Sequence, residues 1–270
     1  MIFRTRTLVC VAALVGLAIL TGAARALADE ACPTSADSIS TDRPGTTNSS
    51  VVVPYGSFQA ENGIDWSVNS GSNLLSESTR LRVGIAHCTE FLIDVPSYAG
   101  SINGSQPSGF TDVVVSFKRQ LPVLFGIEMS ATAGLGFPSG SSKVSGRGYQ
   151  PYIQGPWSYE IAKGWNFGGM FTLSWFPSES TRNPTFGSAL SIVRDLGESA
   201  NMSIDYGGTY DHQRPTQVLD TAGQWRFSNT QQVDFQAGFG LNSSSPDHFV
   251  GIGYSFRIDR LFGQRGAAQP

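Results

Sequence analysis

The sequence predicts an all-β fold: a closed, antiparallel up-and-down transmembrane β-barrel of about twelve strands, within a range of roughly ten to fourteen. Three observations predict it. Apolar and polar side chains alternate with period two, the alternating segments are mostly near ten residues long, and short connections alternate with longer ones. Successive side chains of a strand point to opposite faces, and about ten residues carry a tilted strand across a bilayer.

The N-terminus has the features of a secretory signal peptide. Arg4 and Arg6 precede an apolar run, 8–20, and the small-x-small pattern of a cleavage site follows at 26–28. We therefore expect cleavage after Ala28. A membrane anchor is the alternative, which is disfavoured because the run is shorter than the roughly 20 residues of a spanning helix.

The composition argues against several classes of protein. Charged residues make up 14% of the chain, against roughly 25% in soluble domains. The net charge of −3 and the lack of basic, aromatic-rich patches argue against a nucleic-acid partner. We expect no cofactor and no metal, because no cluster of His, Cys and carboxylates has the spacing of metal ligands.

The segment 165–175, WNFGGMFTLSW, shows how the two faces of a strand differ. Its odd positions are mostly large and aromatic, such as Trp165 and Phe171, and its even positions are mostly small or polar, such as Thr172. Aromatic faces recur along the chain, opposite faces rich in charge and glycine. Glycine suits the crowded inside of a barrel, so we expect the aromatic faces to point outward into lipid. A secreted sandwich or lipocalin-like barrel, with apolar residues inside, is the alternative.

The connections fall into two classes. Short ones are HCTE, RQLPV, IAKGW, RDLGES and FSNTQ, and longer ones include NSGSNLLSE, AGSINGSQPSG, PSGSSKVSGRG, PSESTRN and DHQRP. One rim of tight turns and one of longer loops is typical of bacterial outer-membrane barrels, whose chain ends share the periplasmic rim when the strand number is even. The segments are expected to start near Ser57, Ser78, Glu90, Thr111, Leu124, Tyr149, Trp165, Pro184, Ser199, Gln217, Gln231 and His248.

By parity, the inner face carries most of the charged residues of the strands. They either pair with one another and fill the lumen, or form a polar path whose charges tune selectivity; the two can coexist. The same face carries Asp112, Glu160, Asp220, Arg226 and Arg257. The candidate lumen and solute-path residues are Asp42, Arg43, Glu61, Asp65, Arg80, Arg82, Asp94, Lys118, Glu128, Asp205 and Asp234.

The predicted mature chain has three parts. Residues 29–56 form a polar segment, 57–258 the barrel and 259–270 a tail. The polar segment either hangs in the periplasm as a leader or tucks into the barrel. In the second case, 40–47 would occupy the periplasmic mouth of the lumen and restrict it.

Two cysteines remain once the signal peptide is removed, Cys32 and Cys88. Cys88 lies in a short turn on the rim where the N-terminus also emerges. Because the periplasm is oxidising, we expect these two residues to form a disulfide.

Both ends of the predicted barrel carry family motifs. An S-T-D-R-P segment, a V-P-x-G stretch and a Q-x-E strand lie within Ile39–Gly63, and an N-x-x-x-P-D turn with a V-G-x-G-x-S-F strand lies within Phe239–Ile258. The chain thereby resembles the family called putative MetA-pathway of phenol degradation. The resemblance implies an outer-membrane barrel and, through the family's association with aromatic-compound breakdown, a phenol-type solute. The matching residues of the first motif set are Ser40, Thr41, Asp42, Arg43, Pro44, Val53, Pro54, Gly56, Gln59 and Glu61.

The chain departs from that family at two places. Gly45 stands where an acidic residue is common, and a tail continues past the last strand, where the family commonly stops at an aromatic residue. Phe256 or Phe262 would then be the aromatic residue that the barrel assembly machinery recognises.

Together these features predict a porin-like channel in the outer membrane of a Gram-negative cell, for passive passage or uptake of small compounds, aromatic ones included. Its partners would be outer-membrane lipid, small-molecule solutes and the assembly machinery. A structural or adhesin-like barrel without transport is the first alternative. An outer-membrane lipid hydrolase, using a loop serine with His212 or His248, is the second; we do not expect an enzyme, because no motif fixes such a pair.

Overall fold

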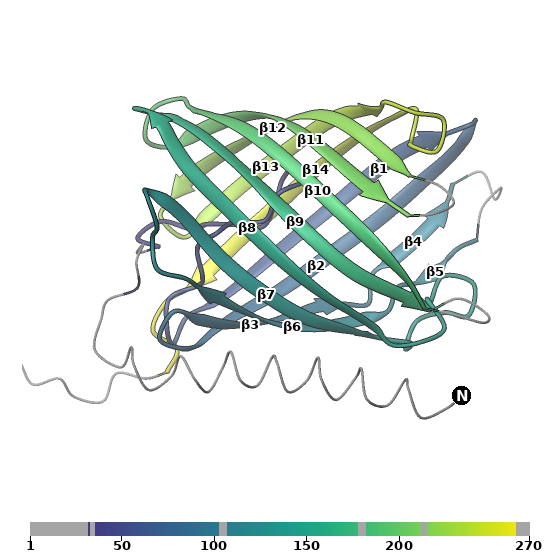
Figure 1. Ribbon diagram of the computed structural model, residues 1–270, viewed down its shortest axis with the longest axis horizontal. Helices are drawn as coiled ribbons and strands as arrows, with labels where there is room; N and C mark the ends of the chain where they lie inside the picture. Colours follow the sequence, from purple (N-terminus) through teal and green to yellow (C-terminus); the bar gives the residue numbers. More distant parts are fainter. Residues whose placement is uncertain (1–31, 33–35, 103–106, 178–181, 212–214, 263–270) are drawn as a thin grey trace, which may run out of the picture. The chain divides into compact units, whose positions relative to one another are not determined.

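The computed structural model describes residue 32 and residues 36–102, 107–177, 182–211 and 215–262, so the expected signal peptide and its cleavage site lie outside the described residues. The chain divides into two units, Met1–Cys32 and Pro33–Pro270. The strands of the second unit (Figure 1) are β1 (Phe58–Asn69), β2 (Ser72–Ala86), β3 (Thr89–Val95), β4 (Tyr98–Ser101), β5 (Gly109–Phe110), β6 (Val113–Gln120), β7 (Ile127–Phe137), β8 (Gln150–Ala162), β9 (Trp165–Pro177), β10 (Arg182–Asp195), β11 (Ala200–Tyr210), β12 (Thr216–Ser228), β13 (Gln231–Gly240) and β14 (His248–Ile258).

These strands close into an antiparallel barrel. β1 pairs with both β2 and β14, which joins the two edges of the sheet. β3 and β4 both pair with β2, and β5 and β6 make up the next strand in the same interrupted way, so the segments form 12 barrel strands. The predicted fold and strand number are confirmed. Within the described part of the chain, no helix has the length and hydropathy needed to cross a membrane.

The two ends of the barrel differ in their connections. We call the end that holds Ser57 and Ile258 the turn rim, and the opposite end the loop rim. Long connections, such as 138–149 between β7 and β8, lie at the loop rim. The connections of the turn rim are 87–88, 121–126, 163–164, 196–199 and 229–230.

One predicted loop, NSGSNLLSE, is wrong. β1 and β2 are joined by a two-residue turn, Ser70 and Gly71, with φ angles of 48° and 80°. Positive φ at both central residues matches the twist of the flanking strands. β2 therefore begins at Ser72 rather than near Ser78.

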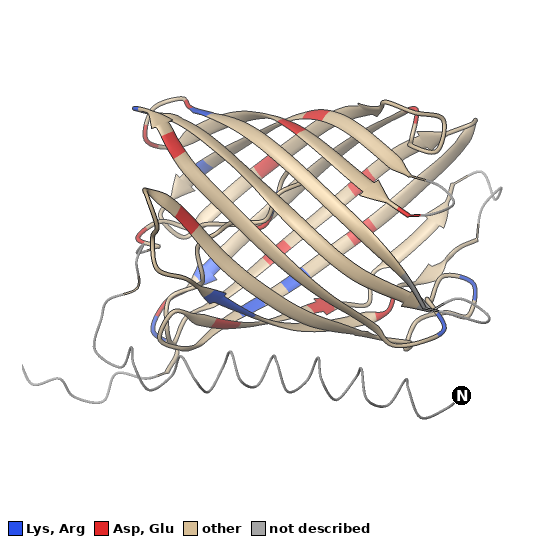
Figure 2. Cartoon of the chain, in the orientation of Figure 1, with Lys and Arg blue, Asp and Glu red and all other residues tan. Residues whose placement is uncertain are grey.

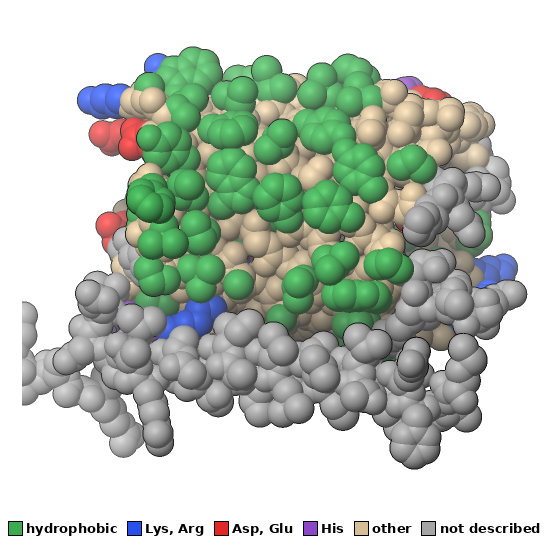
Figure 3. Space-filling view, in the orientation of Figure 1, with side chains coloured by type: hydrophobic (Ala, Val, Ile, Leu, Met, Phe, Trp, Pro, Cys, Tyr) green, Lys and Arg blue, Asp and Glu red, His purple; other side chains and the backbone are tan. Residues whose placement is uncertain are grey.

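The aromatic faces of the strands point away from the lumen, as predicted. Phe171 and Ile252 are 53% and 64% exposed. Phe186 stacks between Phe171 and Tyr210, with ring centroids 6.1 Å apart in both pairs. Figure 3 shows hydrophobic side chains spread over the face of the barrel that it presents. This outer surface has the character that a lipid environment requires.

The chain beyond β14 turns back toward the start of β1. The amide of Leu261 donates to the carbonyl of Gly56 at 2.8 Å. The ring of Phe262 meets that of Tyr55 edge to face, with centroids 6.0 Å apart. The rest of the predicted tail, 263–270, lies outside the described residues.

Candidate functional site

Residues 36–56, which we call the lumen segment, lie inside the barrel. Ile39, Asp42 and Val53 are only 1%, 7% and 2% exposed. At the turn rim, the amide of Ile39 donates to the carbonyl of Asn229, at 2.7 Å. Figure 1 draws the segment in dark purple at the left of the barrel. A solvated leader would not bury an isoleucine and a valine so completely.

The described start of the segment is held by an arginine of β14. The guanidinium of Arg257 donates to the carbonyls of Ala36, Asp37 and Ser38, at 2.7, 3.2 and 3.1 Å. Three backbone acceptors on one side chain fix the path of the segment where it enters the barrel.

Asp42 is the centre of a buried ionic cluster. Its carboxylate lies 3.0 Å from Lys118 Nζ and 3.1 Å from Arg80 Nη1. Its amide donates to Glu61 Oε2 at 2.9 Å. Figure 2 shows bands of Lys and Arg close to acidic bands within the barrel. The Asp42 cluster, as we call it, consists of Asp42, Glu61, Arg80, Arg82, Glu90, Asp94 and Lys118.

Arg82 links the members of this cluster. Its side chain is fully buried and lies 2.8 Å from Glu61 Oε1 and 2.9 Å from Glu90 Oε1. It also donates to the carbonyls of Ser40 and Val51, at 3.0 and 3.1 Å. The planar guanidinium thus joins β1 and β3 to the lumen segment at two separate points of that segment.

The charges around Asp42 control its protonation. Burial alone would raise the pKa of this carboxyl, but the positive charges of Arg82, Lys118 and Arg80 outweigh that effect and hold the pKa well below its usual range. Asp42 is therefore ionised at neutral pH, and its attachment to the wall is a contact between full charges.

Arg43 attaches the segment to β1, β2 and β13. Its guanidinium lies 3.5 Å from both Asp65 and Asp234, and Nη1 donates to Ser78 Oγ at 3.0 Å. It rests on the paired glycines Gly63 and Gly253: a Cβ on either would come within 2.1 or 2.7 Å of an Arg43 atom. Neighbouring residues of the segment thus pair with opposite charges of the wall.

Beyond Arg43 the segment crosses the lumen. The amide of Gly45 donates to Gln236 of β13, at 2.9 Å, and Thr46 Oγ1 donates to the carbonyl of Tyr206 of β11, at 3.3 Å. Two residues further along, the segment reaches β8, where Asn48 donates to Gln154 at 3.2 Å. We call residues 44–48 the tip of the segment.

Two cavities lie along β8 to β12, on either side of this tip. The turn-side cavity has a volume of about 360 Å³ and is lined by Pro44, Thr47 and residues of β7 to β12. The loop-side cavity has a volume of about 390 Å³ and is lined by Thr46 and residues of β9 to β12, including Met170 and Phe176. The tip therefore narrows the lumen at its middle.

The structure divides the predicted lumen residues into three groups. Six belong to the Asp42 cluster, and Asp65 and Asp234 hold Arg43. Glu128 and Asp205 instead line the turn-side cavity. The charged residues that pair around the lumen segment are thus different from those that line the cavities.

Glu90 is a member of the cluster that sequence reasoning missed. It is fully buried, and Glu90 Oε2 accepts from the amide of Val53 at 2.7 Å. The segment HCTE was assigned to a turn, so Glu90 was not counted with Asp94, although both lie on the same face of β3. The parity of Glu90, Leu92 and Asp94 is the signal that could have identified it.

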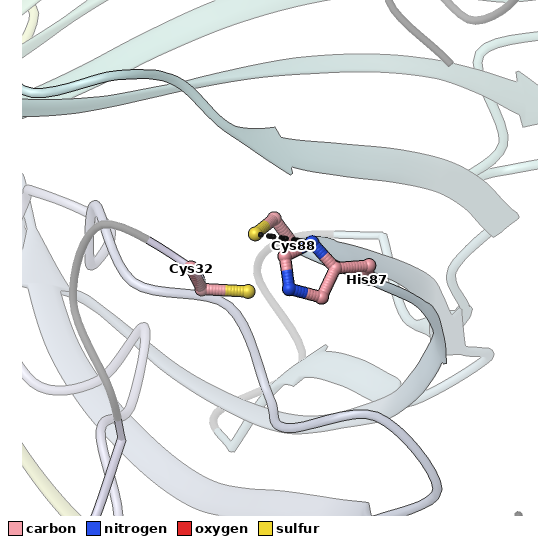
Figure 4. A group of neighbouring side chains, drawn as sticks. All are labelled: Cys32, His87 and Cys88. Atoms are coloured by element: carbon pink, nitrogen blue, oxygen red, sulfur yellow. Dashed lines mark hydrogen bonds between the residues drawn. The ribbon is translucent and has the colours of Figure 1, made fainter. Parts of the chain in front are cut away.

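Figure 4 shows Cys32, His87 and Cys88. Both cysteines are disulfide-bonded. Because thiolates are the form of cysteine that binds metals, we assign no metal to this group. The specific pairing of Cys32 with Cys88 stays a prediction.

Solved structures with a similar fold are outer-membrane proteins. The COG4313 outer membrane channel from Pseudomonas putida F1 is 16% identical, with a TM-score of 0.61 over 80% of this chain and 99% of that chain. The NanC porin is 12% identical, with a TM-score of 0.56 over 74% of this chain and 100% of that chain. At these identities the likeness establishes the fold. No curated protein matches the chain.

A family model assigns the sequence to a family. The model matches residues 41–258, which extend from the lumen segment to the last strand of the barrel. The chain belongs to the family described as putative MetA-pathway of phenol degradation.

Proposed function

We propose that this protein is a channel of the bacterial outer membrane that lets small solutes pass and that the lumen segment narrows. The observation that carries the proposal is the pair of cavities along β8 to β12, separated by the tip of the segment. The similar outer membrane channel and porin support this function. The same proposal includes four further points. The turn rim faces the periplasm, the signal peptide is removed, the barrel contacts outer-membrane lipid, and the assembly machinery recognises it.

The solutes would be small and mostly uncharged. The loop-side cavity is lined by apolar side chains such as Met170, Phe176 and Val218, together with serines, threonines and glycines, and no charged residue of the described chain lines it. Such a lining suits a compact molecule with an apolar body and few polar groups. Together with the family's link to phenol degradation, this favours phenol-type compounds over sugars.

Conductance in planar bilayers and swelling of liposomes test the proposal. We expect discrete current steps from the purified protein, and faster swelling with phenol than with sugars of equal concentration; benzoate shows the effect of a negative charge. A barrel that folds but gives neither current nor swelling would favour the structural or adhesin-like alternative.

The hydrolase alternative has a separate test. His248 packs against Trp66, with ring centroids 5.5 Å apart, and His212 lies outside the described residues. A hydrolase would release fatty acid from phospholipid vesicles, and the His212→Ala or His248→Ala variant would lose that activity. We expect no release from the wild-type protein.

A further inference from the structure

Asp205, on the wall of the turn-side cavity, lies beside a second carboxylate. Asp205 of β11 and Asp220 of β12 are direct cross-strand partners. They are only 1% and 4% exposed. Directly opposite residues of an antiparallel pair have Cβ atoms about 4.5–5.5 Å apart, so the two acidic groups share one small space.

No positive side chain compensates this pair. None of the ion pairs among the described residues includes Asp205 or Asp220. Arg43, of the lumen segment, is held by Asp65 and Asp234. Two buried negative charges without a counter-charge are costly.

The hydrogen bonds of the two residues are also unequal. Ser203 Oγ donates to Asp205 Oδ2. Neither carboxylate oxygen of Asp220 receives a hydrogen bond from another donor of the described chain, and its neighbour is the Asp205 carboxylate. Two carboxylates attract each other only through a proton or a cation placed between them. The chain therefore leaves a place for a positive group.

This place lies beside the tip of the lumen segment. A Cβ on Gly45 would come within 2.9 Å of Asp205 Oδ2, so the backbone of the tip lies close against this carboxylate. Asp205 lines the turn-side cavity next to Ser191 and Ser203, whose hydroxyl oxygens are additional ligands for a cation. A solute that passes the tip along this wall passes Asp205, with Asp220 behind it on the next strand.

We propose that Asp205 and Asp220 bind a positively charged group, either a monovalent inorganic cation or the ammonium group of an organic solute, and make the channel cation-selective. The proposal rests on the proposed channel function. Rings of Asp or Glu select cations in other pores. Arg226, the one basic residue that lines either cavity among the described residues, lies at the turn rim, away from the tip, where it donates to the carbonyl of Glu198.

The test is the reversal potential in a KCl gradient at pH 7. We compare the wild type, Asp220→Asn and the double variant Asp205→Asn with Asp220→Asn. Glu77→Gln is the matched control, because it removes one carboxylate from an exposed position of β2 that pairs with the outward Ile64. The same series in ethylammonium chloride shows whether the site accepts organic ammonium groups as well as potassium.

We expect the wild type to favour potassium over chloride. The permeability ratio of potassium to chloride should fall at least about threefold in the double variant, fall less in Asp220→Asn and stay unchanged in Glu77→Gln. An anion-selective wild type, or equal ratios in the wild type and the double variant, would overturn the site; equal ratios would mean that the pair holds only a proton. A folded wild type without any current would instead refute the channel itself.

Discussion

Arg43 of the lumen segment lies directly over Gly63 of the barrel wall: a Cβ on Gly63 would come within 2.1 Å of the Arg43 Cζ atom. The wall therefore has no side chain at the point where the segment sends its guanidinium across the lumen. Asp65 and Asp234 lie 3.5 Å away on either side of that guanidinium. The glycine of the barrel and the arginine of the segment are therefore matched to each other.

Gly63→Ala should displace Arg43 and loosen the segment. The added methyl group occupies the position of the guanidinium, so Arg43 must leave its carboxylate partners. We expect a higher single-channel conductance than in the wild type, close to that of Arg43→Ala. Gly155→Ala is the control, since no atom lies within 4 Å of its added Cβ. A wild-type conductance in Gly63→Ala would show that Arg43 does not hold the segment.

Arg82→Met should destabilise the protein strongly. It leaves Glu61 and Glu90 as buried carboxylates without their main partner, and breaking a buried pair in this way costs about 3–5 kcal/mol. Urea-induced unfolding in lipid vesicles measures the loss of unfolding free energy. Lys163→Met, in an exposed turn, should change it by less than about 0.5 kcal/mol. Equal effects of the two substitutions would contradict the role of Arg82 in the Asp42 cluster.

Phe171→Arg and Thr172→Arg test the orientation of β9. Phe171 is exposed on the outer wall, and Thr172 lines the loop-side cavity. Arginine in the middle of the lipid-facing surface should cost about 2–4 kcal/mol of unfolding free energy, whereas arginine inside the lumen should cost less. The same vesicle assay gives both values. Equal losses from the two neighbouring positions would refute the outward aromatic face.

Cys32 and Cys88 should be joined in the mature protein. The bond would close a loop of about 56 residues, for which the loop-entropy relation gives roughly 4 kcal/mol of stabilisation before any strain. Alkylation of the denatured, unreduced protein, read by mass spectrometry, should add no label, and reduction beforehand should add two. Two labels without reduction would show that the cysteines are free.

The barrel could be predicted from sequence because each strand separates two different environments. The contrast between lipid and lumen produces the alternation at 165–175, and strand starts at Trp165, Gln231 and His248 agree with the structure. The hairpin at Ser70 and Gly71 was missed because a polar turn followed by polar strand residues has the composition of a loop.

The interior arrangement was harder to predict. The polar composition of the lumen segment and its adjacent acid and base, Asp42 and Arg43, indicated that it could enter the lumen. The residues that the segment contacts there lie far away in sequence. Asp42 meets Lys118, 76 positions along the chain, and Gly45 meets Gln236, 191 positions along. No local pattern encodes such distances. The separation of the lumen into a charged side and a side with cavities became visible only in three dimensions.

The central claim is that the lumen segment narrows a channel, and single-channel conductance tests it most directly. Wild type, Arg43→Ala and a variant lacking residues 40–47 are compared in the same bilayer and salt, after heat-modifiable gel migration has shown that all three are folded. We expect conductance to rise from the wild type to Arg43→Ala and further in the deletion, because the strands and their closure remain while the tip is lost. Three indistinguishable conductances would contradict the account, since the segment would then restrict nothing.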